Sequence, residues 1–394
     1  MVRRQSAAAA GVPMTMPPSP CHPPAVPVAL ALQGGGSHGA FTWGVLDALL
    51  ADGRLQPQGL SGTSAGAVNA VALAAGYAAG APGDGPRHAR DRLGRLWHRI
   101  ARLGHGGVMQ QHLADLYWGS LPKEFAPTHI ARSALQAWYS PYLGNPLDWN
   151  PLRELLCEEI DFAALQSPRA PRVFVSATQV RTGKAVVFSG PRLTVDAVLA
   201  SACLPTLFRA VEIDGEHYWD GGYSANPALA PLIGGCPTAD ILLVQINPIR
   251  RDALPTGPAD ILDRAGELCF NASLLQQLRA IDLINRLIAD GQLRGGACRA
   301  VRLHRIDGGA AMLDFPASGR TRADPRLVEQ LFEIGRKAAA RWLTDHFDDL
   351  GRRSSIDVAA DYLDDSSGLL RAPAPPGSGA GWLERFRRWL RRSG

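Results

Sequence analysis

The sequence predicts a single α/β domain, and three observations support this prediction. Segments typical of buried strands alternate with segments typical of helices along the 394 residues, an order that favours a sheet packed against helices. Hydrophobic residues make up 46% of the chain and charged residues 20%, which is enough apolar material for one large core. Two glycine-rich segments each connect a strand pattern to a helix pattern.

Short apolar runs predict the strands, and apolar residues three or four positions apart predict the helices. The predicted strands cover residues 26–32, 172–178, 185–189, 241–247 and 300–306. The predicted helices cover residues 65–79, 87–103, 261–289 and 325–346, and another is expected to follow the first strand through Phe41, Val45 and Leu49. Core packing fully explains the apolar stripe of the last helix.

Residues 26–366 are predicted to form the folded domain, and segments of different composition flank it. Residues 1–25 lack the apolar core of a signal peptide, so we expect a disordered lead. Residues 367–381 are rich in proline, glycine and serine and predict a flexible linker. Residues 103–150 hold seven of the 27 aromatic residues, which favours either a lid over a site or a small helical subdomain with its own aromatic core.

Residues 382–394 form a basic segment with helical amphipathic spacing. Trp382, Phe386 and Trp389 fall on one face, and the five arginines of the segment fall outside that face. The pattern is typical of a helix in a membrane surface, with its apolar face among acyl chains and its arginines at anionic phosphates. A terminal helix packed on its own domain or on a partner would show the same pattern. We expect the membrane contact, because a linker precedes the segment and tryptophans lie near both of its ends.

Charge and cysteine content narrow the function further. The net charge is +5, and the basic excess lies at the two ends of the chain rather than on the domain, which argues against a nucleic-acid partner. The six cysteines show no paired spacing and fit a reducing compartment, so we expect a cytoplasmic protein associated peripherally with membranes. No cluster of histidine, cysteine and acidic residues has metal-ligand spacing, so we expect neither a metal nor another cofactor.

The first glycine-rich segment runs from Gly34 to Gly39 with the sequence Gly-Gly-Gly-Ser-His-Gly. Glycines allow backbone N–H groups to converge on a developing negative charge, and the start of the following helix adds its positive dipole end. The segment also satisfies the dinucleotide fingerprint, which needs an acidic residue about 20 positions further on at the end of a second strand. Asp52 lies near that distance, but its surroundings are typical of a turn. An oxyanion-binding loop is therefore the favoured interpretation.

The second segment, Gly62-Thr63-Ser64-Ala65-Gly66, places a serine between two glycines. The glycines let the chain turn sharply from strand to helix and leave the hydroxyl exposed at the bend. The run of small apolar residues that follows is typical of a buried helix, so the motif has the setting that a nucleophile elbow needs. A glycine-rich turn with an incidental serine is the alternative. The motif predicts acyl-transfer chemistry with Ser64 as the nucleophile.

The third segment, Asp220-Gly221-Gly222, has by itself a sequence common in turns, and the same three residue types recur from Asp307. Its context is more specific, because an Ala-Ser-Ala-Cys-Leu-Pro segment lies upstream and Asn226-Pro227 follows. Together and in this order, the three segments resemble the patatin-like phospholipases, which are serine lipid acyl hydrolases, over roughly residues 28–363. The resemblance implies a three-layer α/β fold with a central, mostly parallel sheet and helices on both faces.

In the family that the chain resembles, serine and aspartate act as a dyad without histidine, and the glycine loop forms the oxyanion hole. The resemblance thus implies Ser64 and Asp220 as the catalytic residues. The implied oxyanion hole and its supporting positions are Gly34, Gly35, Gly36 and Gly39, with Gly62, Gly66, Gly221 and Gly222. The loop departs from the family pattern at His38, where an arginine or lysine is common, and His38 either contacts the site or only packs.

The expected function is hydrolysis of a lipid ester through an acyl-enzyme, as in a phospholipase A or lysophospholipase, with residues 26–366 as the catalytic domain. An α/β-hydrolase with a Ser-His-Asp triad is a second alternative, and it needs His304 or His346, the two histidines that follow Asp220. A non-catalytic scaffold on a lipid surface or granule is a third.

Overall fold

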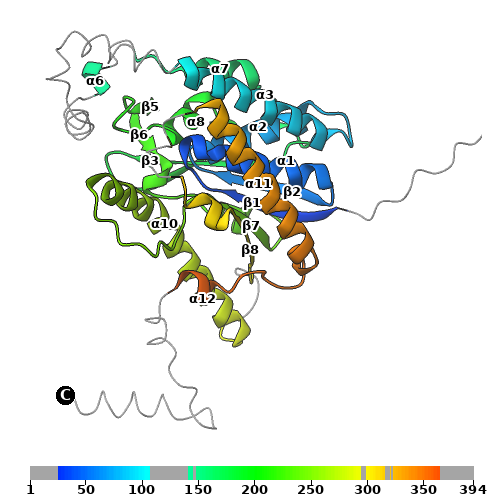
Figure 1. The fold of residues 1–394 in the computed structure, drawn as a ribbon. Helices are drawn as coiled ribbons and strands as arrows, with labels where there is room; N and C mark the ends of the chain where they lie inside the picture. Colours follow the sequence, from blue (N-terminus) through cyan, green and yellow to red (C-terminus); the bar gives the residue numbers. More distant parts are fainter. Residues whose placement is uncertain are drawn as a thin grey trace, which may run out of the picture.

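Eight strands form one mixed sheet in the computed structural model, which describes residues 25–106, 141–144, 148–293, 299–315, 320 and 323–363 (Figure 1). In chain order the strands are β1 (Val26–Leu32), β2 (Leu55–Gly62), β3 (Arg172–Gln179), β4 (Ala185–Ser189), β5 (Val211–Ile213), β6 (Glu216–Asp220), β7 (Asp240–Gln245) and β8 (Arg302–Asp307). The order across the sheet is β5-β6-β3-β2-β1-β7-β8, and β4 pairs with β3 off this path. Strands β3, β2, β1, β7 and β8 are parallel, whereas β4, β5 and β6 pair antiparallel. This confirms the predicted α/β class with a mostly parallel sheet.

Helices lie between most consecutive strands along the chain and after the last strand. They are α1 (Gly39–Asp52), α2 (Ala65–Ala79), α3 (Gly85–Gly106), α6 (Pro141–Gly144), α7 (Pro151–Glu159), α8 (Val195–Ser201), α9 (Ala230–Gly235), α10 (Pro258–Ala289), α11 (Pro325–His346) and α12 (Val358–Tyr362). Two short 3-10 turns, η1 (Gly36–His38) and η5 (Gly221–Tyr223), lie at the edge of the sheet where the parallel strands end.

Alternate residues of β1 point into two different cores. Val28, Leu30 and Leu32 pack with α1, α2, α3 and α11, whereas Ala29 and Ala31 pack with α9, α10 and α12. Because side chains alternate along a strand, β1 is buried on both faces, as a central strand of a parallel sheet must be. The result is three layers, with helices on both faces of the sheet.

Local sequence patterns located most of the long elements. The predicted strands 26–32 and 185–189 and the predicted helices 65–79 and 325–346 agree with the observed bounds. The other predicted elements differ by one to three residues at their ends, and the hairpin of β5 and β6 was not predicted.

Some predictions fall outside the described residues. They concern the lead up to residue 24, most of residues 103–150, the linker at 367–381 and the basic segment at 382–394 with Trp382, Phe386 and Trp389. Among the helices that the structure describes, none has the length and apolar content needed to cross a bilayer.

Candidate active site

Ser64 occupies the turn between β2 and α2, at the edge where the parallel strands end. Its backbone has φ 54° and ψ −123°, a strained conformation for a residue other than glycine and one typical of a nucleophile elbow. The positions of Gly62 and Gly66, on either side of the serine, leave no room for a side chain. A Cβ on Gly62 would lie 2.4 Å from the Gly66 carbonyl oxygen, and one on Gly66 would lie 2.1 Å from the Leu32 carbonyl oxygen.

Hydrogen bonds from neighbouring elements fix this elbow. The Ser64 N–H donates to Ser201 Oγ at 2.9 Å, at the end of α8. Thr63 Oγ1 donates to the Ala225 carbonyl at 2.7 Å and lies 2.5 Å from Ser176 Oγ in β3. Since all of these groups are buried, the bonds hold the backbone that carries the Ser64 hydroxyl in one place.

Asp220 ends β6 and is completely buried. Its N–H donates to the Cys203 carbonyl at 2.8 Å, and its carbonyl accepts from Thr178 Oγ1 at 2.7 Å. Oδ1 accepts the Gly222 N–H at 2.7 Å, whereas Oδ2 has no hydrogen-bond partner within the described part of the chain. A buried carboxylate oxygen without a partner is unusual, and it is available to a reacting group.

Burial raises the pKa of Asp220 from its usual value of 3.8 to about 7. Three neighbours act in the opposite direction and lower this pKa: the Gly222 amide, the Ser64 side chain and the positive charge of Arg320. Desolvation outweighs them because the whole carboxylate lies away from water. A buried carboxylate with a strongly raised pKa, close to a serine at the end of a strand, is typical of a functional site.

Close backbone contacts bring the three glycine-rich motifs together. A Cβ on Gly221 would lie 2.9 Å from Thr63 Cγ2, and one on Gly34 would lie 2.9 Å from Ser64 Cβ. The glycine loop, the elbow and the turn after Asp220 therefore meet at one place on the sheet edge.

Two N–H groups of the glycine loop have no acceptor among the described residues. The Gly34 N–H donates to Asn226 Oδ1 at 2.7 Å, and the Gly39 N–H bonds to carbonyls of the 3-10 turn that precedes it. For the N–H groups of Gly35 and Gly36, the described residues supply no acceptor. Of the four glycines that the resemblance assigned to an oxyanion hole, only these two have donors that a substrate oxygen could use.

Buried side-chain amides hold the loop in this position. Gln33 Oε1 accepts the N–H groups of Ile246 and Asn247, each at 2.8 Å, and Gln33 Nε2 donates to Asn271 Oδ1 at 2.9 Å. Asn247 Nδ2 donates to the Gly34 carbonyl at 3.2 Å. Gln33 and Asn247 were not identified from the sequence, although polar residues within two positions of the ends of two buried strands are a recognisable signal.

Arg320 is a second residue that the sequence did not point to. Its carbonyl oxygen lies against Gly36, where φ is 57° and an added Cβ would be 2.3 Å from that oxygen. Its guanidinium carbon lies 5.8 Å from the centre of the Phe270 ring, and its Nε has no hydrogen-bond partner among the described residues. The charge of Arg320 lowers the pKa of both His38, in the glycine loop, and Asp220, the proposed base.

His38 belongs to the glycine loop and is 3% exposed. Burial, reinforced by Arg320, lowers its pKa to about 4, so the ring is neutral at pH 7. The ring makes an edge contact with Phe315, with 6.1 Å between centres. His38 therefore does not supply a positive charge to the loop.

The structure does not support the two alternative enzyme classes. His304 bonds to Asp240 at 3.1 Å and His346 to Asp349 at 3.1 Å, so both candidate triad histidines are engaged with carboxylates other than Asp220. Asp52 ends α1 and not a second strand, so it is not placed as the ribose-binding residue of a dinucleotide site.

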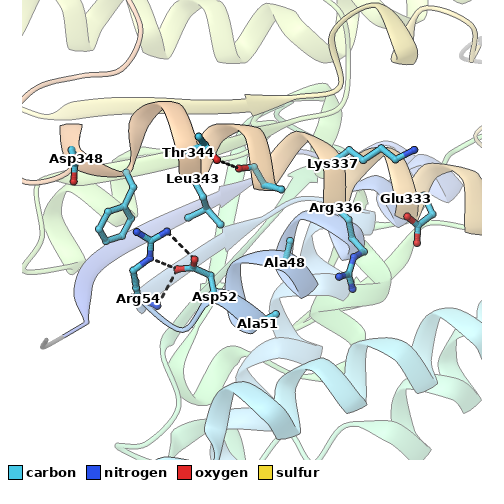
Figure 2. A pocket seen from close by; sticks show the side chains of 12 residues that line it. Ala48, Ala51, Asp52, Arg54, Glu333, Arg336, Lys337, Leu343, Thr344 and Asp348 are labelled. Atoms are coloured by element: carbon cyan, nitrogen blue, oxygen red, sulfur yellow. Dashed lines mark hydrogen bonds and ion pairs between the residues drawn. The ribbon is translucent and has the colours of Figure 1, made fainter. Parts of the chain in front are cut away.

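A surface groove of about 640 Å³ lies between α1 and α11 (Figure 2). Asp52 and Arg54 form an ion pair in it, with Arg54 Nε 2.8 Å from Asp52 Oδ1. None of its lining residues belongs to the three motifs, so the groove is separate from the Ser64 site. Within the described ranges, no three histidine, cysteine or acidic residues gather in a way that could hold a metal ion.

Comparison with known proteins assigns the family. The family model described as patatin-like phospholipase matches residues 30–233, which is 204 of the 394 residues. Among solved structures, VipD from Legionella pneumophila is 14% identical with a TM-score of 0.38, over 89% of this chain and 75% of that one. ExoU of the Pseudomonas aeruginosa type III secretion system, solved with SpcU, is 15% identical with a TM-score of 0.25, over 87% and 77%. A search of curated proteins found no match. The match to the family model covers more than half of the chain and confirms the resemblance: the chain belongs to the patatin-like phospholipase family.

Proposed function

We propose that the protein hydrolyses lipid esters with Ser64 and Asp220 as a catalytic dyad. Membership of the patatin-like phospholipase family implies lipid acyl hydrolase activity in general terms. Two observations carry the finer proposal: the buried Asp220 Oδ2 lacks a hydrogen-bond partner among the described residues, and the side chain of the strained Ser64 is close enough to lower the pKa of Asp220.

In the first half of the reaction, Ser64 Oγ attacks the ester carbonyl carbon and its proton passes to Asp220 Oδ2. The carbonyl oxygen becomes an oxyanion and accepts the N–H groups of Gly35 and Gly36. When the oxyanion collapses, the bond to the alcohol breaks, Asp220 returns the proton to the leaving alcohol, and the acyl group stays on Ser64.

Water completes the cycle in the second half. Asp220 removes a proton from a water molecule, which attacks the acyl-enzyme carbonyl, and the second oxyanion is held by the same two N–H groups. Collapse releases a carboxylic acid, and the proton on Asp220 returns to Ser64 Oγ.

Burial makes Asp220 a competent base for this work. A carboxylate with an ordinary pKa holds a proton too weakly to accept one from a serine hydroxyl, whereas a pKa of about 7 lies close to the working pH. The Gly222 amide, the Ser64 side chain and, to a smaller extent, the charge of Arg320 oppose the shift, because each favours the ionised form of Asp220.

The proposed substrate is a lipid ester, and the proposed setting is the periphery of a membrane in the cytoplasm. The basic amphipathic segment at 382–394 is a proposed contact with anionic lipid through Trp382, Phe386 and Trp389. Its pattern supports this contact by charge and spacing alone.

Hydrolysis of a soluble p-nitrophenyl ester tests the dyad. Ser64→Ala and Asp220→Asn should each lower kcat by at least about a thousandfold. Asp307→Asn is the matched control, because Asp307 begins the other Asp-Gly-Gly turn and bonds to the Gly309 N–H at 2.9 Å in the same way, yet lies outside the site. Wild-type rates in either dyad variant would overturn the proposal, and a folded but inert wild-type protein would favour the scaffold alternative.

A further inference from the structure

The first half of α10 turns apolar side chains toward solvent. Between residues 261 and 272, every exposed position is apolar: Ile261, Leu262, Ala265, Leu268, Cys269 and Ala272. Leu262 is 67% exposed and Leu268 is 52% exposed. Spacings of three, four and seven residues place this set on one side of the helix, and we refer to the set as the α10 stripe.

Polar residues occupy the buried side of the same turns. Glu267 is 1% exposed and is bonded by Arg251, with Nη2 2.6 Å from Oε1, and by Arg264 at 3.1 Å. Asn271 is 1% exposed and bonds to Gln33. Phe270 is buried on the same side, so this half of α10 buries a mixed polar and apolar face and exposes an apolar one, whereas a surface helix normally exposes its polar side. The buried ion pairs and amides fix the orientation of the helix about its axis, because rotation would leave these buried polar groups without their partners.

The α10 stripe lies beside the proposed active site. Because α10 begins after β7, its first half lies at the edge where the parallel strands end, the edge that also carries Ser64. Phe270 connects the two: a Cβ on Gly222 would lie 2.3 Å from its ring, and the Tyr223 ring is 5.4 Å from it, centre to centre. Tyr223 is itself 42% exposed, so apolar surface continues from the turn after Asp220 to the stripe.

We infer that the α10 stripe is a lipid-contact face, which seats the protein on a lipid surface with the Ser64 site next to that surface. The inference rests on the proposed function, since a lipid ester must reach Ser64 from an aggregate. An exposed apolar face of this kind is unusual on a protein surface in contact with water. A lipid aggregate is the partner that the adjoining ester-hydrolase site requires, and it would cover this face.

Charge distinguishes this face from the basic segment at 382–394. The exposed positions of the stripe carry no charge, and the exposed acidic residue of the first turn, Asp260, precedes them. Contact through the stripe should therefore occur on zwitterionic lipid and depend little on salt, whereas contact through the arginines needs anionic lipid and weakens with salt.

The full-length double variant Leu262→Glu/Leu268→Glu tests the inference. Both positions are exposed, so folding should be retained, as a thermal melt will verify. On phosphatidylcholine vesicles we expect at least about tenfold weaker sedimentation and a similar loss of vesicle hydrolysis, since each leucine leaves apolar surroundings. Hydrolysis of a monomeric p-nitrophenyl ester should stay at the wild-type rate.

Leu283→Glu is the matched control, because Leu283 is 45% exposed on the same helix but lies in its second half. Equal vesicle binding by wild type and double variant would overturn the inference, as would an equal loss in Leu283→Glu. If wild type is a dimer, the double variant a monomer, and vesicle binding unchanged, the stripe binds a second copy instead of lipid. An inert wild type on the soluble ester would overturn the proposed function alone, because vesicle sedimentation still reports on the stripe.

Discussion

Replacing Asp220 by asparagine should abolish ester hydrolysis and, at the same time, stabilise the folded protein at neutral pH. Asparagine keeps the oxygen that accepts the Gly222 N–H, and its amide group replaces Oδ2, which has no partner among the residues that the structure describes. The side chain then cannot take the proton of Ser64. It also no longer carries a charge that complete burial disfavours.

The size of the stability change follows from the pKa of Asp220. Because burial raises this pKa from 3.8 to about 7, the folded chain holds a proton between these pH values that the unfolded chain has released. The free energy of unfolding of the wild type therefore falls as pH rises through this window, by about 1.4 kcal/mol per pH unit and about 4 kcal/mol at most in total. Relaxation around the charge reduces the figure, so Asp220→Asn should gain about 1–3 kcal/mol at pH 8 and close to nothing at pH 4.

Urea denaturation of both proteins at pH 4, 6 and 8 measures this difference. Asp307→Asn should show no gain that grows with pH, because Asp307 is partly exposed and pairs with Arg305 at 2.7 Å. A gain that is the same at all three pH values, or a loss of stability at pH 8, would refute the explanation by a buried charge.

Other parts of the site give predictions of their own. The kcat/KM for a soluble ester should rise with pH around a midpoint near 7, because Asp220 must be ionised, and Arg320→Gln should move that midpoint to higher pH, since Arg320 lowers the pKa of Asp220. An unmoved midpoint in the pH–rate profile would contradict this role of Arg320. Asn226→Ala removes the acceptor that positions the glycine loop, so kcat should fall by about 10- to 100-fold with a smaller change in KM in steady-state kinetics; an effect on KM alone would oppose it. Gly66→Ala places a Cβ 2.1 Å from a carbonyl oxygen of β1 and should lower the free energy of unfolding by about 3 kcal/mol or more, as measured by thermal melting. Gly53→Ala, whose Cβ would have no atom of the described residues within 4 Å, should lower it by only about 1 kcal/mol because of its positive φ. Similar melting temperatures for the two glycine variants would contradict the packing argument.

The features that the sequence could predict are those whose geometry is local. Strand 26–32 and helix 65–79 follow from apolar runs, and the elbow follows from two glycines around Ser64. The close approaches that require Gly62 and Gly66 arise within a few residues of the serine or on the adjacent strand, so the motif contains almost all of the information.

The hairpin that carries Asp220 also has a local signal, which the strand prediction did not use. Asp214 and Gly215 connect β5 to β6 with φ of 54° and 76°, and Asp-Gly between two strands is typical of a type I′ turn. Each strand is short, and their apolar alternation is weak, so only the turn identifies the pair.

The contacts that tune the site could not be predicted, because they join residues far apart in the chain. Asn226 reaches Gly34 across 192 positions, and Gln33 reaches Asn271 across 238. Arg320 affects Asp220 only because the fold places it against the glycine loop. The shift in the pKa of Asp220 arises from burial by the whole domain, which no motif specifies.

The most direct test of the dyad is covalent capture of the nucleophile. A fluorophosphonate probe should form one adduct on the wild-type protein, mapped by mass spectrometry to Ser64, with no adduct on Ser64→Ala and a rate reduced at least about a hundredfold on Asp220→Asn. An adduct on another residue, or labelling of Ser64 at an unchanged rate without the Asp220 carboxylate, would contradict the account.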